Sequence, residues 1–408
     1  MKRIFLLLAL TFTTSFLFSQ AWLNNLPKDK SNKKLTFFDY QKAFNDYWAP
    51  YHVDKGYYFD KGVKKKAAGW KQFKRWEHNM ESQVNPTTGA FPEKTAQEVY
   101  EAYLKTSPKL KSKSASAWTS LGTSSSSGGY AGVGRLNSIA FHPTDMNTYW
   151  VGAASGGLWV TTNNGSSWIC LTDNNAALAV SDIVIPSDFA TSNTIYIATG
   201  DKDHWDNRSV GVLKSTNGGS TWSTTGISYT LANSSMVYRL LIDPNNNQTL
   251  IAATSNGVYK TTNGGTTWNT QLTSTSFIDM EYKPGDFNTL YGSTTTGRIY
   301  VSTNGGSTWT QTFYDANAQR MELAVSANQS GWVYAVAANS SDGLYGIYQS
   351  TNSGTSFTQV FAGTTKNLLG WYDGTPATDV GGQGWYDLSL AVSPTNASTL
   401  LVGGVDTW

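Results

Sequence analysis

Cysteine is almost absent from this sequence, because Cys170 is the only one among 408 residues. An intrachain disulfide is therefore excluded, and the fold must be held together by its buried core. Charged residues are also scarce, at 14 %, and only two glutamates, Glu281 and Glu322, follow residue 117. No hydrophobic run long enough to span a membrane follows the first twenty residues, so no transmembrane helix is expected in the mature chain.

Aromatic and small polar residues are abundant instead. The chain has 16 Trp, 22 Tyr and 38 Gly, and it is rich in Ser, Thr and Asn. This composition is typical of many short strands joined by tight turns and predicts an all-β fold.

The N-terminus has the pattern of a secretory signal peptide. Lys2 and Arg3 precede an apolar stretch from Ile4 to Phe18, and the small Ser19 comes before Gln20. We therefore expect residues 1–19 to direct export and the mature protein to be secreted or held at the outer cell surface.

Charge divides the remaining chain into two regions. Residues 20–116 hold 18 Lys and Arg against 10 Asp and Glu, a net of +8, whereas residues 117–408 hold 10 against 18, a net of −8. Apolar spacing in the first region predicts short helices at residues 37–48, 70–80 and 93–104, followed by a linker at residues 105–116. We expect a helical leader packed on or tethered to the main domain, with a cleaved pro-region as the alternative. No nucleic-acid partner is expected, because the large region is acidic and the basic one has no recognised binding motif.

An internal repeat dominates residues 117–408. Five segments of eight residues end in an aromatic residue, and these aromatics lie 54, 46, 41 and 48 residues apart. In each segment Asn stands third, Gly fifth and the aromatic eighth, at these positions: Asn163, Gly165, Trp168; Asn217, Gly219, Trp222; Asn263, Gly265, Trp268; Asn304, Gly306, Trp309; Asn352, Gly354, Phe357. The Asn side chain is expected to bind a backbone N–H two residues on, and the Gly to adopt positive φ, so these are structural turns.

The segments between the turns predict a β-propeller. Each repeat contains strand patterns for a four-stranded blade, which needs neighbouring blades to bury its faces. We expect at least six blades, with Trp118 starting a strand that completes the last one and Trp408 in the position of Trp159. The sixth unit stops part-way, so the propeller is expected to be incomplete and further C-terminal domains to follow.

The repeated turns resemble the Asp-box, or BNR, family, whose pattern is Ser/Thr-x-Asp-x-Gly-x-Thr-Trp. That family includes sialidases, sortilin-type receptors and tandem-propeller xyloglucanases, and here Asn replaces the usual Asp in all five copies. The leader and blades also resemble surface proteins exported by type IX secretion. The resemblance implies a propeller fold and implies far less about activity.

The residues needed for the family's glycosidase activities are missing or scattered. The resemblance places a catalytic Asp of xyloglucanases at Ala154, which cannot ionise. The sialidase Phe/Tyr-Arg-Ile-Pro motif is absent, and Arg135, Arg208, Arg239, Arg298 and Arg320 are scattered along the chain. We therefore predict no catalytic residue.

Two insertions between strands are the candidate binding loops, because propellers usually bind ligands on inserted loops. The first loop, residues 200–209, offers Asp201, Asp203, His204, Trp205 and Asp206, and the second loop, residues 367–384, offers Trp371, Asp373 and Asp379. Aromatic rings beside carboxylates suit sugar stacking or peptide capture. No cofactor is expected other than a candidate calcium ion on Asp201, Asp203 and Asp206, with a plain solvated loop as the alternative.

These observations predict an exported, non-catalytic propeller that binds a glycan or a protein. A glycoside hydrolase of the xyloglucanase or sialidase type is the first alternative, and it requires a carboxylate pair at the mouth of the propeller channel. Sortilin-like capture of a peptide inside the channel is the second.

Overall fold

The computed structural model describes residues 21–30, 35–106, 134–203, 207–233, 235–371 and 379–408. The predicted signal peptide and Trp118 lie outside these residues. The chain divides into two compact units, Met1–Phe91 and Pro92–Trp408. Among the described residues, no helix has both the length and the apolar character needed to cross a membrane.

The first unit is a small helical body with an aromatic core. Its elements are η1 (Ala21–Asn25), α1 (Phe37–Trp48), η3 (Ala49–Tyr51), β1 (Tyr57–Asp60), β2 (Val63–Lys66) and α2 (Trp70–Glu81). Trp22, Phe44 and Phe73 are buried together between the helices, with the rings of Phe44 and Phe73 stacked 3.8 Å apart. The helices predicted at residues 37–48 and 70–80 are confirmed, whereas the β1–β2 hairpin was not predicted, because it lies within a lysine-rich segment.

Helix α1 starts where its sequence supplies a cap. The Thr36 hydroxyl accepts a hydrogen bond from the Asp39 backbone N–H, and the Asp39 carboxylate accepts one from the Thr36 N–H at 2.8 Å. This reciprocal box satisfies donors that the first helical turn leaves free.

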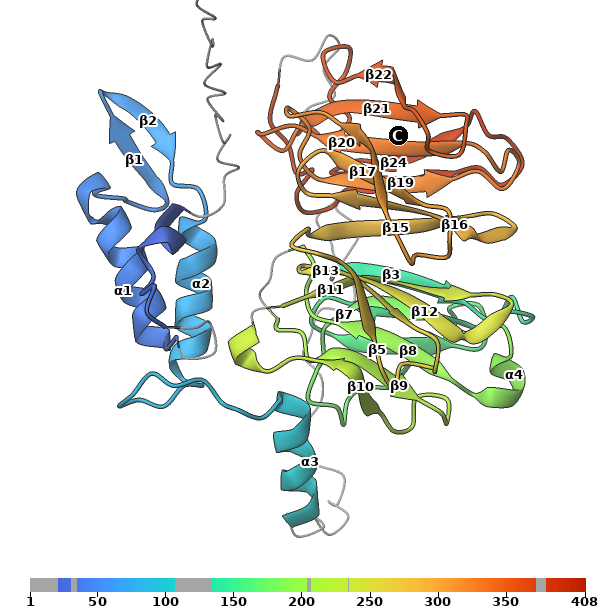
Figure 1. The fold of residues 1–408 in the computed structure, drawn as a ribbon, viewed down its shortest axis with the longest axis horizontal. Helices are drawn as coiled ribbons and strands as arrows, with labels where there is room; N and C mark the ends of the chain where they lie inside the picture. Colours follow the sequence, from blue (N-terminus) through green and yellow to red (C-terminus); the bar gives the residue numbers. More distant parts are fainter. Residues whose placement is uncertain (1–20, 31–34, 107–133, 204–206, 234, 372–378) are drawn as a thin grey trace, which may run out of the picture. The chain divides into compact units, whose positions relative to one another are not determined.

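The second unit is a β-propeller of antiparallel blades, shown in Figure 1. It begins with α3 (Ala96–Thr106), which confirms the third predicted helix. Five four-stranded sheets follow: β3 (Leu136–Phe141), β4 (Tyr149–Ala153), β5 (Gly157–Thr161), β6 (Ile169–Cys170); β7 (Val180–Val184), β8 (Ile195–Thr199), β9 (Gly211–Ser215), β10 (Ser223–Ser228); β11 (Val237–Asp243), β12 (Asn246–Thr254), β13 (Gly257–Thr261), β14 (Asn269–Thr273); β15 (Phe277–Lys283), β16 (Asp286–Thr294), β17 (Arg298–Ser302), β18 (Thr310–Tyr314); β19 (Met321–Val325), β20 (Val333–Ala338), β21 (Leu344–Ser350), β22 (Thr358–Ala362). Two short helices, α4 (Phe189–Ser192) and η4 (Leu231–Asn233), lie in the connections.

The expected count of at least six blades is confirmed only in part. The described residues contain five four-stranded blades, and the sixth unit, which was expected to stop part-way, forms a two-stranded sheet of β23 (Ser389–Val392) and β24 (Leu400–Gly403). Trp408 does occupy the position predicted for it. Its backbone exchanges hydrogen bonds of 2.9 and 3.1 Å with Val402, in the way that Trp159 pairs with Val151 in the first blade.

Blades bury their faces against one another, so each core layer lies between two sheets. One cluster joins Trp150 and Leu158 of the first blade to Val180 and Ile195 of the second, and a similar layer follows at each later pair of blades. The inner strands β3, β7, β11, β15, β19 and β23 contact one another in chain order. Side chains at the starts of these strands therefore gather from distant parts of the sequence.

Candidate functional site

The candidate site lies at one edge of the blades, which we call the loop face. It comprises the described residues of segment 200–210 between β8 and β9, the described residues of segment 363–387 between β22 and β23, and the starts of the inner strands. Because strands within each blade are antiparallel, the second-to-third strand connections and the blade-to-blade connections leave the sheets at this same edge. The repeated turns lie at the opposite edge, since each joins a third strand to a fourth.

Each repeated turn is held by the same side-chain bonds. In the third copy the Asn263 Oδ1 accepts a hydrogen bond from the Thr267 backbone N–H at 2.9 Å, and the Thr261 hydroxyl accepts one from Gly265 N–H at 3.1 Å. The Asn therefore binds the N–H four residues on, so the predicted offset of two residues is wrong. The predicted positive φ of the fifth-position glycine is confirmed in all five copies, with values between 78° and 90°. The turns are structural parts of the blades.

Three arginines join six carboxylates near the inner strands. We call Arg135, Arg239, Arg320, Asp182, Asp201, Asp203, Asp279, Glu281 and Glu322 the axial network. Although these arginines are far apart in the sequence, the propeller brings them to the starts of inner strands in the first, third and fifth blades. The network therefore has twice as many carboxylates as guanidinium groups.

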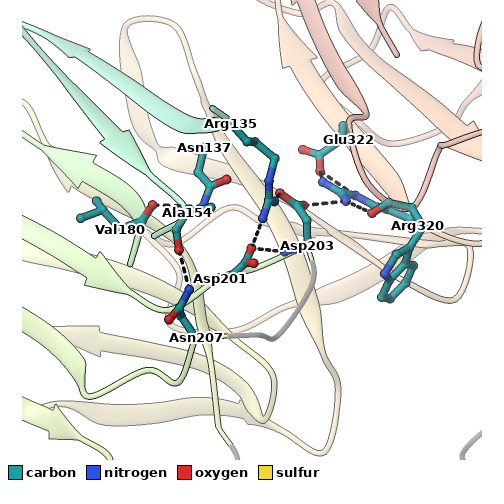
Figure 2. Close-up of polar contacts among 10 residues, drawn as sticks. Arg135, Asn137, Ala154, Val180, Asp201, Asp203, Asn207, Arg320 and Glu322 are labelled. Atoms are coloured by element: carbon teal, nitrogen blue, oxygen red, sulfur yellow. Dashed lines mark hydrogen bonds and ion pairs between the residues drawn. The ribbon is translucent and has the colours of Figure 1, made fainter. Parts of the chain in front are cut away.

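One half of the network ties the first loop to the starts of β3 and β19. Arg135 binds Asp201 Oδ1 at 2.6 Å and also donates to Asp203, and Arg320 Nη1 binds the other oxygen of Asp203 at 2.7 Å. Arg320 Nη2 then reaches Glu322 Oε1 at 2.6 Å. Figure 2 shows this alternating row from Asp201 to Glu322. Asp201, Asp203 and Arg320 are each less than 5 % exposed, so the first loop is anchored by buried charge.

The other half of the network joins three blades through Arg239 on β11. Its Nη2 lies 2.6 Å from Glu281 Oε1, and its side chain approaches Asp182 at 3.5 Å and Asp279 at 3.4 Å. Asp182 and Asp279 also accept backbone hydrogen bonds from Leu240 and Leu323 of the following inner strand, at 2.7 and 2.8 Å. These two aspartates therefore connect inner strands of adjacent blades.

Burial sets the protonation behaviour of the acidic groups. It raises the pKa of Asp279, Glu281 and Glu322, and in each case the neighbouring arginine only partly opposes it. Burial also raises the pKa of Asp387, just before β23. For Arg320, burial acts to lower the pKa, but the charges of Glu322 and Asp203 raise it above its ordinary value. The arginines stay charged, and the surplus carboxylates are drawn toward the neutral form.

Arg320 also attaches the second loop to the first. Its Nη1 donates a hydrogen bond to the Trp385 backbone carbonyl as well as to Asp203, and Arg135 lies 4.7 Å from the centre of the Tyr386 ring. The two loops selected from the sequence are therefore neighbours on one face. Sequence reasoning missed Arg135, Arg320, Trp385 and Glu322 as members of this site.

The second loop is built around buried Asn367. Its Nδ2 donates to the carbonyls of Asp379 and Gly381 at 2.9 and 2.7 Å, and its Oδ1 accepts from Leu344 N–H at 2.7 Å. The Asp379 carboxylate accepts hydrogen bonds from Gly381 and Trp371 backbone N–H groups, so it shapes the loop. Trp371 remains 54 % exposed and Trp385 39 % exposed.

Several predicted site residues cannot be placed. His204, Trp205, Asp206 and Asp373 lie outside the described residues. Of the proposed calcium ligands, Asp201 and Asp203 are bound by arginines. Among the residues that the structure describes, no group of three or more His, Cys, Asp or Glu side chains is arranged to hold a metal ion.

Ala154 lies directly after β4, beside the first loop. It is 7 % exposed, and its carbonyl accepts a hydrogen bond from Asn207 Nδ2 at 3.1 Å, as Figure 2 shows. Asn207 Nδ2 also donates to Ser155 Oγ at 2.7 Å. The position that the resemblance assigns to a catalytic carboxylate is thus a buried methyl group beside an amide.

Comparison with known proteins shows partial similarity to xyloglucanases. No family model matches the chain. A xyloglucanase from Paenibacillus sp is 29 % identical over 134 residues, which is 29 % of this chain and 12 % of that protein. The chain therefore spans only a small part of the curated relative that it matches.

The solved structures that resemble the chain include two GH74 enzymes. An ancestral GH74 enzyme has a TM-score of 0.49 at 21 % identity, covering 67 % of this chain and 35 % of its own. The GH74 xyloglucanase from Xanthomonas campestris has a TM-score of 0.48 at 17 % identity, and the match covers 66 % of this chain and 42 % of that enzyme's chain. YCF48 bound to D1 peptide has a TM-score of 0.40 at 18 % identity, and the match covers 56 % of this chain and 68 % of the YCF48 chain.

Proposed function

We propose that this chain is an exported, non-catalytic propeller protein that binds a glycan or a protein through its loop face. The observation that carries the proposal is the pairing of the six network carboxylates with three arginines, next to Ala154 in place of a carboxylate. A general acid must deliver a proton and a nucleophile must reach the sugar, and bonding to arginine hinders both tasks.

The loop face has the features of a binding surface. Trp371 and Trp385 are exposed residues of the type that stacks on a sugar, and this favours a glycan over a protein ligand. Buried polar atoms nearby have no hydrogen-bond partner among the described residues, namely Arg135 Nε, Asn137 Oδ1 and Asp387 Oδ1. A polar ligand would satisfy such groups.

Binding is tested with a glycan array, followed by titration calorimetry with the best glycan. Replacing Trp371 or Trp385 with Ala should weaken binding by about tenfold, since stacking on an aromatic ring contributes about 1 kcal/mol or more. Trp168→Ala is the matched control, because Trp168 is 37 % exposed but lies at a repeated turn on the opposite edge. Equal losses in all three variants would contradict a site on the loop face.

A glycoside hydrolase is the alternative function. Its support is the partial identity to a xyloglucanase and the raised pKa of Glu281, Glu322 and Asp387, since a general acid needs a raised pKa. A reducing-sugar assay on xyloglucan decides between the two, and we expect no release of sugar. Hydrolysis that disappears in Glu281→Gln or Glu322→Gln, with the fold intact by circular dichroism, would overturn the non-catalytic proposal.

A further inference from the structure

The β1–β2 hairpin of the first unit exposes lysines and apolar side chains together. Four lysines, Lys61, Lys64, Lys65 and Lys66, lie in or beside it and are all exposed, against a single acidic residue, Asp60. At its tip, Phe59 is 70 % exposed and Val63 is 59 % exposed. Apolar side chains this exposed at the end of a hairpin are not part of the core of their own unit.

The hairpin is a defined projection with a firm base. Lys61 and Gly62 form a two-residue turn with φ of 49° and 81°, the left-handed geometry that suits a tight hairpin. At the base, the Tyr58 ring packs 5.1 Å from Tyr51 and 5.9 Å from Trp48 at the end of α1. The tip is therefore held in a fixed arrangement.

Apolar and basic side chains are mixed at the tip of the hairpin, and tyrosine stands at its base. Lys61 lies in the turn, Val63 flanks it opposite Asp60, and Phe59 pairs with Lys64 one step further on, whereas Tyr57 stands at the base with Lys64 Nζ 4.5 Å from its ring centre. A lipid surface offers acyl chains to the apolar side chains, anionic phosphates to the lysines and a hydrated interface that favours tyrosine.

From this combination of exposed apolar side chains and excess positive charge we propose that the hairpin docks the protein on an anionic lipid surface, with Phe59 and Val63 inserted and the lysines on phosphate groups. Phe59 shares one face of the hairpin with Lys64, whereas Val63 shares the other with Asp60. A polysaccharide or nucleic acid would lie along one face, but a lipid interface surrounds the tip on both. This inference concerns a surface distinct from the loop face of the propeller.

Sedimentation of the whole chain with vesicles tests the proposal. We expect binding to vesicles of phosphatidylglycerol and phosphatidylcholine in equal parts, weakened by salt, and little binding to phosphatidylcholine alone. Lys64→Gln with Lys66→Gln should weaken binding about thirtyfold, and Phe59→Ser about tenfold.

The controls make the same chemical changes at other exposed positions. Lys28→Gln with Lys105→Gln removes the same charge, and Leu104→Ser removes an apolar side chain that is 53 % exposed. Absence of binding to the anionic vesicles, or equal losses in the control variants, would overturn the proposal. Binding to dextran sulfate would also overturn it, if the protein binds no vesicles and Phe59→Ser leaves the binding to dextran sulfate unchanged. The partner would then be an anionic polymer.

Discussion

The tryptophans that close the repeated turns differ in burial although they occupy the same position in the repeat. Trp222 is 9 % exposed, and its Nε1 donates a hydrogen bond to the Leu171 carbonyl of the preceding blade at 3.2 Å. Trp168 is 37 % exposed. One sequence position therefore has different energetic roles in different blades.

Replacing Trp222 with Ala should lower the free energy of unfolding by about 3–5 kcal/mol, because a large ring is removed from between two blades. Trp168→Ala is the matched substitution, and we expect it to lower the free energy of unfolding by only about 1 kcal/mol. Urea unfolding followed by circular dichroism measures both. Similar costs for the two variants would show that burial between blades does not decide the role of this residue.

The Asn of a repeated turn should matter less than a buried Trp. Asn263→Ala removes the acceptor for Thr267 N–H and should cost about 1 kcal/mol in the same unfolding measurement. Asn263→Asp keeps that acceptor but loses the donor to the Thr267 hydroxyl, so its cost should be smaller. An Asp variant less stable than the Ala variant would contradict this assignment.

At the scale of elements, Arg320 at the start of β19 connects two loops that are far apart in the chain. It binds Asp203 of the first loop, the Trp385 carbonyl of the second and Glu322 of its own strand. A single guanidinium has enough donors for all three because it offers five N–H groups in a planar arrangement. The loop face therefore depends on a buried ionic connection.

Replacing Arg320 with Met should cost about 3–5 kcal/mol, since it leaves Asp203 and Glu322 buried without this cation. It should also speed amide hydrogen exchange in residues 379–388, because the second loop loses an anchor. Arg298→Met is the control. Arg298 lies 4.4 Å from the Tyr314 ring outside the axial network, and its loss should leave exchange in that segment unchanged. Unchanged exchange in Arg320→Met would show that the loop is held without the arginine.

At the scale of the whole molecule, the surplus of buried carboxylates makes stability depend on pH. The raised pKa values of Asp279, Glu281, Glu322 and Asp387 mean that the folded state takes up protons at higher pH than the unfolded chain does. Acidification from neutral pH therefore favours the folded state until these groups are protonated in both states. Asp145 and Asp286 act in the opposite direction, because hydrogen bonds from Thr148 and Thr289 lower their pKa.

We expect the melting temperature of the propeller to rise as the pH falls from 7 to about 5, and to fall again below about pH 4. Differential scanning calorimetry across this range measures the profile. Glu281→Gln should reduce the rise in melting temperature between pH 7 and 5, because it removes one of the four carboxyl groups with a raised pKa. A melting temperature that declines steadily from pH 7 would mean that the network is stable in its fully ionised form.

The sequence by itself determined the elements that depend on local patterns. The spacing of five turn segments predicted the blades, and the apolar spacing predicted α1, because turns and helices are set by residues close together in the chain. It did not predict the β1–β2 hairpin, whose strands carry exposed lysines instead of an alternating apolar face. The repeat pattern also predicted a sixth unit that stops part-way, and the structure has two paired strands there, β23 and β24.

Only the tertiary structure decided where the charged residues meet. Arg135, Arg239 and Arg320 have no shared motif. Each meets its carboxylates because it stands at or near the start of an inner strand, and the inner strands of successive blades lie side by side. The acidic residues of the first loop were predicted to face a ligand or calcium, yet Asp201 and Asp203 are bound by these arginines. Their partners come from other blades, and an ionic contact between residues so far apart in the chain exists only once the propeller has formed.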